Sequence, residues 1–135
     1  MTATRQSRLM IAKLVLKLMQ HYSAIIFLDQ HFGKHAQDIV IMLGVSVGTH
    51  EGKPMTAAKL ADFVCIPRAT IVRRVKLLSD MGLLDLNHQK QISLSESLDQ
   101  RAMKTAPVMN KSAILRTAAF LSKLDSEAIA SKKGR

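Results

Sequence analysis

The fold is decided by the stretch MTAAKLADFVCIPRATIVRRVKLLSDMGLL, residues 55–84. Thr56 is a good N-cap for a short helix. The side chains that this helix turns towards a core are Ala57, Leu60, Ala61 and Val64. After a turn at residues 64–66, Pro67 occupies the favoured first position of a second helix. The stretch therefore predicts two short helices joined by a tight turn, which is the helix-turn-helix layout.

The second helix has one apolar face and one basic face. Ile71, Val75 and Leu78 follow helical spacing and form the buried face, and Gly82 supplies a left-handed stop. The opposite face carries Arg68, Ala69, Val72, Arg73 and Lys76, with Thr70 and Arg74 at its flanks. Guanidinium groups donate paired hydrogen bonds to guanine, and small apolar side chains pack against a thymine methyl. This face suits the major groove of DNA.

Beyond Gly82 the apolar period changes to that of a strand. Leu84 and Leu86 alternate with polar residues, and so do Ile92 and Leu94, across a polar turn at residues 87–90. The pattern predicts a small β-hairpin with one buried face, packed beside the helix pair as a wing.

Apolar helices are expected at both ends of the chain. Residues 6–31 form the first helix, and Gly33 is placed to end it. The apolar stripe of this helix runs most of the way round, so it needs more cover than a small domain supplies, and we infer a partner subunit. The residues assigned to a homodimer interface are Leu14, Leu18, Tyr22, Ile25, Ile114, Leu115, Ala118 and Leu121.

Other local signals complete the layout. Residues 36–47 are rich in β-branched side chains, and periodicity alone cannot separate a helix from a buried strand there, but the helix-turn-helix context favours a helix. Ser95 is a candidate cap, Pro107 should break or restart the last helix, and residues 131–135 form a frayed basic tail. We expect a mainly α fold with a hairpin wing: residues 1–34 and 98–135 form dimerisation helices around a winged helix-turn-helix at 35–97.

The composition bounds the class of protein. A chain of 135 residues with 47% hydrophobic residues is long enough for one domain with a real core. The single cysteine, Cys65, excludes an intramolecular disulfide framework and a cysteine-based zinc site. Residues 1–8 lack a secretory signal, and the longest uncharged run before Asp29, residues 18–28, is short for a membrane span. We expect a cytoplasmic protein that does not use a membrane.

The charge balance points to a polyanion. Lys plus Arg number 20 against 10 Asp plus Glu, and the sequence pI is about 10.2, above the level of about 9 that marks candidate nucleic-acid binders. Within residues 53–94 the basic side chains are Lys53, Lys59, Arg68, Arg73, Arg74, Lys76 and Lys90, against Asp62, Asp80 and Asp85. The alternative is a solvated cationic helix face. Four of these cations lie on one helix that the layout presents outward, which favours DNA contact.

The same stretch resembles the winged helix-turn-helix of the MarR family of bacterial transcriptional regulators. The matching elements are the Leu60-Ala61 pair, the Pro-x-x-Thr-Ile-x-Arg run at residues 67–73, and Leu78 followed by Met-Gly-Leu-Leu at residues 81–84. The resemblance implies a homodimer built by the first and last helices and recognition helices that enter successive major grooves of a pseudo-palindromic operator. It also implies that a small-molecule effector would bind between the dimer helices and the winged domain.

The wing departs from the family pattern. MarR-type wings usually carry an Asp-x-Arg element whose arginine enters the minor groove. This chain has no arginine between Arg74 and Arg101, and its wing tip offers only His88 and Lys90. The departure leaves two alternatives, a DNA binder with weak wing contacts or a winged-helix subunit that contacts protein.

Residues with other chemistry give weaker signals. His31 and His35 have a metal-ligand spacing, but Gly33 breaks the helix that such a site requires, so surface or capping histidines and no bound metal are expected. Cys65 is expected to be a small core residue, with a redox-sensing thiol as the alternative. We find no catalytic constellation and no cofactor motif, so we do not expect an enzyme.

Overall fold

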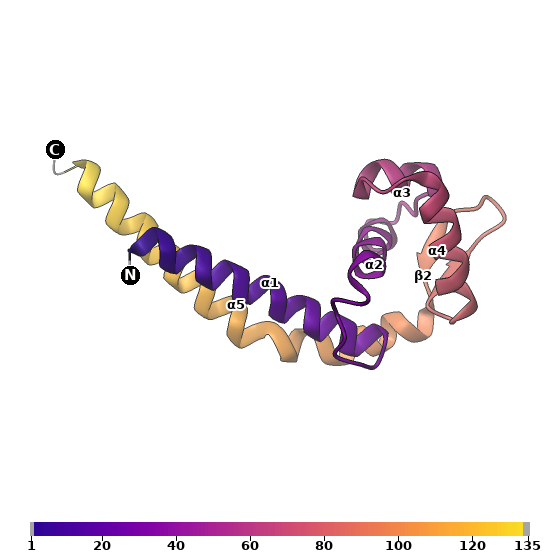
Figure 1. Ribbon diagram of the computed structural model, residues 1–135, viewed down its shortest axis with the longest axis horizontal. Helices are drawn as coiled ribbons and strands as arrows, with labels where there is room; N and C mark the ends of the chain where they lie inside the picture. Colours follow the sequence, from indigo (N-terminus) through magenta and orange to yellow (C-terminus); the bar gives the residue numbers. More distant parts are fainter. Residues whose placement is uncertain (1, 134–135) are drawn as a thin grey trace.

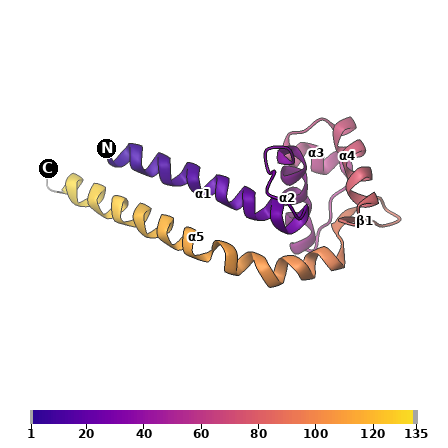
Figure 2. The same cartoon turned by 60° about the horizontal axis from the view of Figure 1, so that its bottom comes forward.

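Two long helices form an arm, and the other elements pack into a head at one end of it (Figure 1). The computed structural model describes residues 2–133. Within this range it describes every side chain except those of residues 103, 105–110 and 131–133. The elements are α1 (Ala3–Ile26), α2 (Ala36–His50), α3 (Ala57–Val64), α4 (Arg68–Asp80), β1 (Leu84–Leu86), β2 (Ile92–Leu94) and α5 (Glu96–Lys133). In the arm, α1 and α5 run antiparallel (Figure 2). The predicted mainly α fold with a small hairpin is confirmed.

Local capping residues begin and end the helices of the head. The Oγ1 atom of Thr56 accepts a hydrogen bond from the Lys59 N–H, as expected of an N-cap. Gly82 has a φ of 78°, which makes it the predicted left-handed stop after α4. The Oγ atom of Ser95 accepts a hydrogen bond from the Leu98 N–H and so caps α5.

Several predicted boundaries were wrong. Pro67 is the N-cap of α4 and not its first residue, because its ψ of 139° is extended. The first helix ends at Ile26, five residues earlier than predicted, and Leu28 adopts the left-handed conformation expected of Gly33. The uncertain segment after it is a helix, as favoured, and continues to His50.

Hydrogen bonds of the α1–α2 turn explain why α1 ends early. The Asp29 carboxylate lies 2.9 Å from His35 Nε2 and accepts hydrogen bonds from the Ser23 hydroxyl and the His31 N–H. The His35 ring stacks on Phe27, with ring centroids 4.0 Å apart. The contact with His35 holds the pKa of Asp29 below its ordinary value. These contacts turn the chain from α1 towards α2 at a point where the apolar residues of the sequence still continue.

The core of the head lies between α2, α3, α4 and the hairpin. The predicted core faces of α3 and α4 are buried at Leu60, Ile71 and Leu78. The fully buried side chains that complete the core include Ile41, Met42, Val45, Leu84 and Ile92. At Gly44 a Cβ atom would lie 2.7 Å from side-chain atoms of Leu60 and Val64, so glycine permits α2 and α3 to pack closely.

The hairpin pairs Leu84 with Leu94 and Leu86 with Ile92 in antiparallel register. Met55 forms an isolated antiparallel bridge to Ile92, on the edge of β2 that faces away from β1, and its carbonyl accepts a hydrogen bond of 2.8 Å from the Ile92 N–H. Leu86 was predicted to be buried but is 48% exposed, because it lies at the end of β1, where the turn of the hairpin begins, whereas Leu84 at the start of the strand is buried.

The last helix is continuous. We expected Pro107 to break it, but α5 runs from Glu96 to Lys133 through that residue, and Figure 2 shows it curved along its length. A proline within a helix removes one backbone hydrogen bond, and the helix kinks where it does not end. The backbone of the predicted tail is helical as far as Lys133, and residues 134–135 lie outside the described part of the chain.

The arm buries part of the predicted dimer interface within a single chain. Ile25 is 6% exposed, which removes it from any surface that a partner could contact. Leu14, Leu18, Tyr22 and Leu121 are half-buried, whereas Ile114, Leu115 and Ala118 are exposed. The face of α5 turned towards α1 is centred on Thr117, which is 6% exposed, so the predicted stripe was rotated from the real contact.

By length and composition α1 is the one described helix that could cross a membrane, with a mean hydropathy of 1.3 over its most apolar window. Such a test is also passed by helices of water-soluble proteins, and only 17% of that window is buried within the chain. The apolar surface of α1 therefore lacks cover in one copy of the chain.

Tyr22 gives the fold a dependence on alkaline pH. Burial raises the pKa of Tyr22 from 10.0 to about 12. A raised pKa in the folded state means that this group stabilises the fold fully below pH 10 and loses that contribution as the pH rises towards 12. We expect urea unfolding at increasing pH to show this loss in the native protein and a smaller loss in Tyr22→Phe. Because Tyr22 is the single tyrosine, tyrosinate absorbance measures its titration directly.

Candidate nucleic-acid interface

The basic face of α4 is open to solvent. Arg68, Arg73 and Lys76 are exposed, and so are Ala69 and Val72 between them. The buried residues of α4 lie on its opposite face, so the packing of the helix on α3 and the hairpin fixes which side it presents. The sequence predicted this exposed face, apart from Arg74.

The three exposed cations of α4 are open to an external anion. Within the part of the chain whose side chains are described, Arg68, Arg73 and Lys76 make no ion pair with any carboxylate. Neighbouring cations without counterions raise the local positive potential and attract anions. The face therefore has both the exposure and the charge that contact with a phosphate backbone needs.

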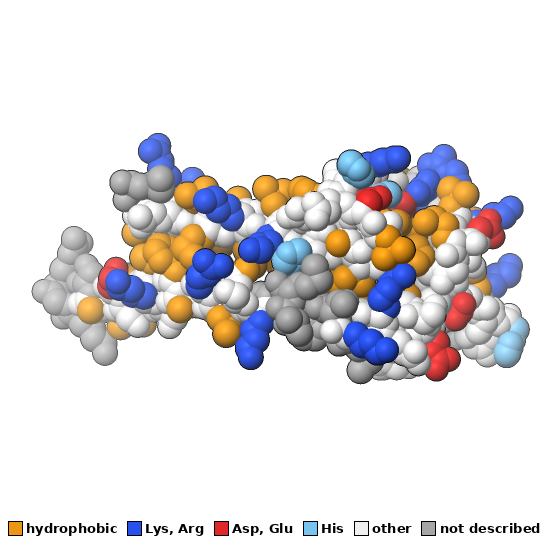
Figure 3. All heavy atoms as spheres, turned by 90° about the horizontal axis from the view of Figure 1, so that it is seen from below, with side chains coloured by type: hydrophobic (Ala, Val, Ile, Leu, Met, Phe, Trp, Pro, Cys, Tyr) orange, Lys and Arg blue, Asp and Glu red, His pale blue; other side chains and the backbone are white. Residues whose placement is uncertain are grey.

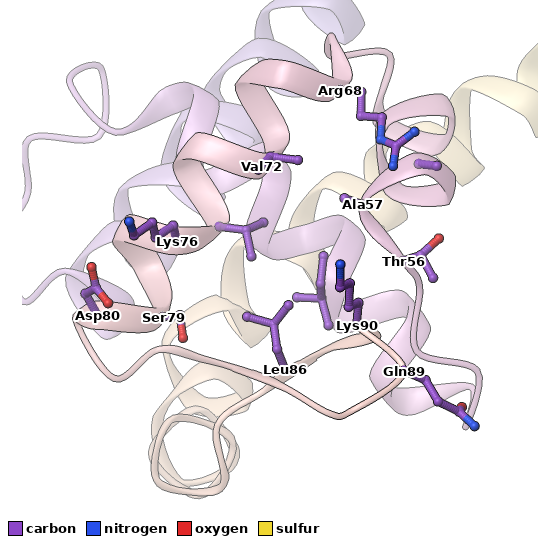
Figure 4. Close-up of a pocket in the computed structure, with 13 residues that line it drawn as sticks. Thr56, Ala57, Arg68, Val72, Lys76, Ser79, Asp80, Leu86, Gln89 and Lys90 are labelled. Carbon is purple, nitrogen blue, oxygen red and sulfur yellow. The ribbon is translucent and has the colours of Figure 1, made fainter.

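The turn of the hairpin adds a further cation. Asn87 Oδ1 accepts hydrogen bonds from the N–H groups of Gln89 and Gln91, and this closes the turn. Lys90 has a φ of 60°, in the left-handed region, so the turn directs its side chain by an uncommon backbone conformation. Figure 4 shows Lys90 on the same side of the hairpin as the side chains of α4.

A hollow of about 580 Å³ separates α4 from the hairpin turn and the start of α3. Its cations are Arg68, Lys76 and Lys90, and its one carboxylate is Asp80 (Figure 4). The apolar lining includes Val72 and the exposed Leu86. The hollow is partly open, and its lining combines three cations with apolar side chains.

Arg74 does not belong to the open face. Its Nε atom donates a hydrogen bond of 2.8 Å to Asp38 Oδ1, and its Nη2 atom donates a second to Oδ2. These hydrogen bonds raise the pKa of the guanidinium, against the opposing effect of partial burial. This pairing within the chain separates Arg74 from the unpaired cations of α4, and its contact with DNA stays a prediction. Sequence spacing did not reveal it, because Asp38 lies 36 residues away.

The remaining predicted residues are scattered around this surface. Thr70 is half-buried on the flank of α4, and Lys53 and Lys59 are exposed before and within α3. Gln89 lines the hollow and was missed, because a turn glutamine carries no charge signal. Thr56 and Ala57 also line it, although the sequence assigned them to capping and to the core.

The two weaker sequence candidates have structural roles. Cys65 is exposed and left-handed, with a φ of 59°, at the C-terminal end of α3, so its predicted place in the core was wrong. His35 is the N-cap residue of α2 and is paired with Asp29, while His31 is exposed. Among the described residues, no group of three metal-ligating side chains comes together.

Comparisons of the chain with protein-family models, with characterised proteins and with solved structures found no match.

Proposed function

We propose that the chain is a sequence-specific, double-stranded DNA-binding transcriptional regulator of the winged helix-turn-helix class. It acts in the cytoplasm as a homodimer on a pseudo-palindromic operator. The observation that supports this most strongly is the open face of α4, on which Arg68, Arg73 and Lys76 are exposed and make no ion pair with any described carboxylate. A helix that follows another after a tight turn and presents cations outward has the dimensions and the charge for the major groove.

The two ends of α4 have different tasks in this proposal. Arg68 and Thr70 are in the first turn, the part of a recognition helix that reaches base edges, and Arg73 is one turn further on. Lys76 and Lys90 flank the hollow between α4 and the hairpin, and there they contact phosphate oxygens of one strand. The hairpin then serves as a wing that binds the backbone, which needs no arginine in the minor groove.

The homodimer is supported by the uncovered apolar side of the arm. Leu9, Ile11, Val15 and Leu16 of α1 and Ile114, Leu115 and Ile129 of α5 are each at least 42% exposed. Figure 3 shows apolar side chains gathered along the arm. Exposed apolar side chains gathered in this way are typical of an interaction site. A second copy of the chain would cover it by two-fold symmetry and space the recognition helices roughly 34 Å apart, one duplex turn.

A salt titration tests the function. With random-sequence duplex, affinity should fall by roughly 10³ to 10⁵ between about 50 and 200 mM salt if six to ten phosphates are neutralised per dimer. Fluorescence anisotropy of a labelled duplex measures this fall. Selection from a random duplex pool should then enrich a two-fold-symmetric sequence.

The rival function is a winged-helix subunit whose α4 face binds an acidic protein surface. The observation that favours it is the apolar part of the lining, where the exposed side chains of Val72 and Leu86 lie beside the cations and offer contacts to apolar side chains of a protein. Absence of duplex binding at low salt would support this rival and rule out the DNA-binding proposal.

A further inference from the structure

The four cations of α4 have different environments. Arg68, Arg73 and Lys76 are exposed and make no ion pair with any described carboxylate, whereas the Arg74 side chain is 31% exposed and bonded to Asp38, whose side chain is 8% exposed. Asp38 lies in the first turn of α2. The pair thus joins the helix that carries the exposed cations to the helix at the centre of the head.

The geometry of the pair restrains α4. Two parallel hydrogen bonds between a planar guanidinium and a carboxylate fix the orientation of the arginine relative to the carboxylate. A lysine in the same place would fix only the distance between the two charged groups. Arg74 lies at the boundary between the buried face of α4 and its open face, next to Val75. A restraint at this boundary fixes how far α4 is rotated about its own axis, and so which side chains it presents to solvent.

Burial makes the restraint persistent. A carboxylate as buried as that of Asp38 requires a partner, because an unpaired charge in that place is strongly unfavourable. Arg74 is the donor of both hydrogen bonds described for this carboxylate. Release of Arg74 towards a phosphate would leave Asp38 unpaired, so the guanidinium stays with Asp38 when DNA approaches.

We propose that Asp38 is a positioning residue for DNA binding, which withholds Arg74 from the phosphates and fixes the rotation of α4 through that side chain. The inference rests on the proposed function. The Asp38–Arg74 pair therefore costs each subunit one non-specific phosphate contact. In return, Arg68 and Thr70 are held in a fixed orientation towards the DNA. Such an exchange lowers affinity for random DNA relative to the selected site.

The test compares Asp38→Asn with Arg74→Gln. Both substitutions break the ion pair, but only Asp38→Asn keeps the Arg74 guanidinium and frees it from its partner. For each variant, and for the double variant, affinity for random duplex is measured against salt concentration. We expect Asp38→Asn to steepen the log–log slope by about 1.8, the value of one added phosphate contact in each subunit of the dimer, and Arg74→Gln and the double variant to keep the wild-type slope.

The alternatives give different slopes. If Arg74 contacts DNA in the native protein, Arg74→Gln lowers the slope by about 1.8, which is 0.9 for each subunit of the dimer, and the inference is wrong. If Asp38→Asn keeps the wild-type slope, Arg74 is not withheld, and the inference is also wrong. A merely structural pair would lower the melting temperature of both variants without separating their slopes.

The wild-type protein is the control that distinguishes failure of the proposed function from failure of this inference. A wild-type protein that binds no duplex overturns the proposed function, and with it this inference. A wild-type protein that binds, with variants that behave otherwise than expected, overturns the inference alone. Should Asp38→Asn fail to fold, Asp38→Ser supplies a second variant that frees Arg74.

Discussion

Replacing Arg68, Arg73 and Lys76 together by glutamine should lower affinity for duplex DNA roughly ten-thousandfold at constant salt. Each of the three is exposed and makes no ion pair within the described side chains, so none contributes to the fold through a salt bridge. Each lost contact with DNA is worth roughly 1 kcal/mol, and the six lost from a homodimer correspond to a factor of about 10⁴. The slope of affinity against salt should fall by about 5.4, which is 0.9 for each of the six cations.

A matched control separates the effect of the α4 cations on DNA affinity from the effect of overall net charge. Glutamine at Lys13, Lys17 and Lys123 removes the same number of charges from the arm, out of a formal net charge of +10. If affinity depends on net charge alone, the two triple variants weaken binding equally, and α4 is not the interface. Anisotropy titrations give the affinities, and thermal unfolding checks that both variants keep the native melting temperature.

The head was largely predictable because its signals are local. Thr56, Gly82 and Ser95 act within three residues of their own positions, and the burial of Ile71 and Leu78 follows from helical spacing. The open face of α4 follows as the complement of that buried face. These features need no knowledge of the rest of the chain.

The errors arose where distant residues decide the conformation. Arg74 is removed from the open face by Asp38, and α1 ends early because Asp29 pairs with His35. No spacing rule marks either contact. Cys65 failed for another reason: apolar neighbours suggested a core position, but the turn needs a left-handed residue, and that conformation directs the side chain outward.

The candidate site was predicted in outline but not in shape. The sequence located the cations of α4, yet it gave no indication that Lys90 and Leu86 share a hollow with them. That arrangement depends on the length of the hairpin and on the left-handed turn at Lys90, which together decide where the tip lies.

Val15→Lys should convert the proposed homodimer into a monomer without unfolding the chain. Lys13, Lys17 and Arg116 line a groove on one side of the seam between α1 and α5. Helical spacing of 100° per residue places Ile11, Val15 and Ile114 on the other side of that seam. Val15 is 48% exposed, so a lysine there meets water in one copy of the chain.

The same lysine is unfavourable in a dimer, because the partner would bury an unpaired charge at a cost of roughly 3 kcal/mol, which weakens association about a hundredfold. Ala119→Lys is the control, because it adds the same charge at an exposed position of α5. Ala119 lies at helical spacing from Arg116 and Lys123, and so away from the apolar side of the seam. Sedimentation equilibrium should show monomers for Val15→Lys and dimers for the control. A dimeric Val15→Lys would mean that copies meet elsewhere, and a monomeric native protein would mean that DNA binding does not depend on this surface.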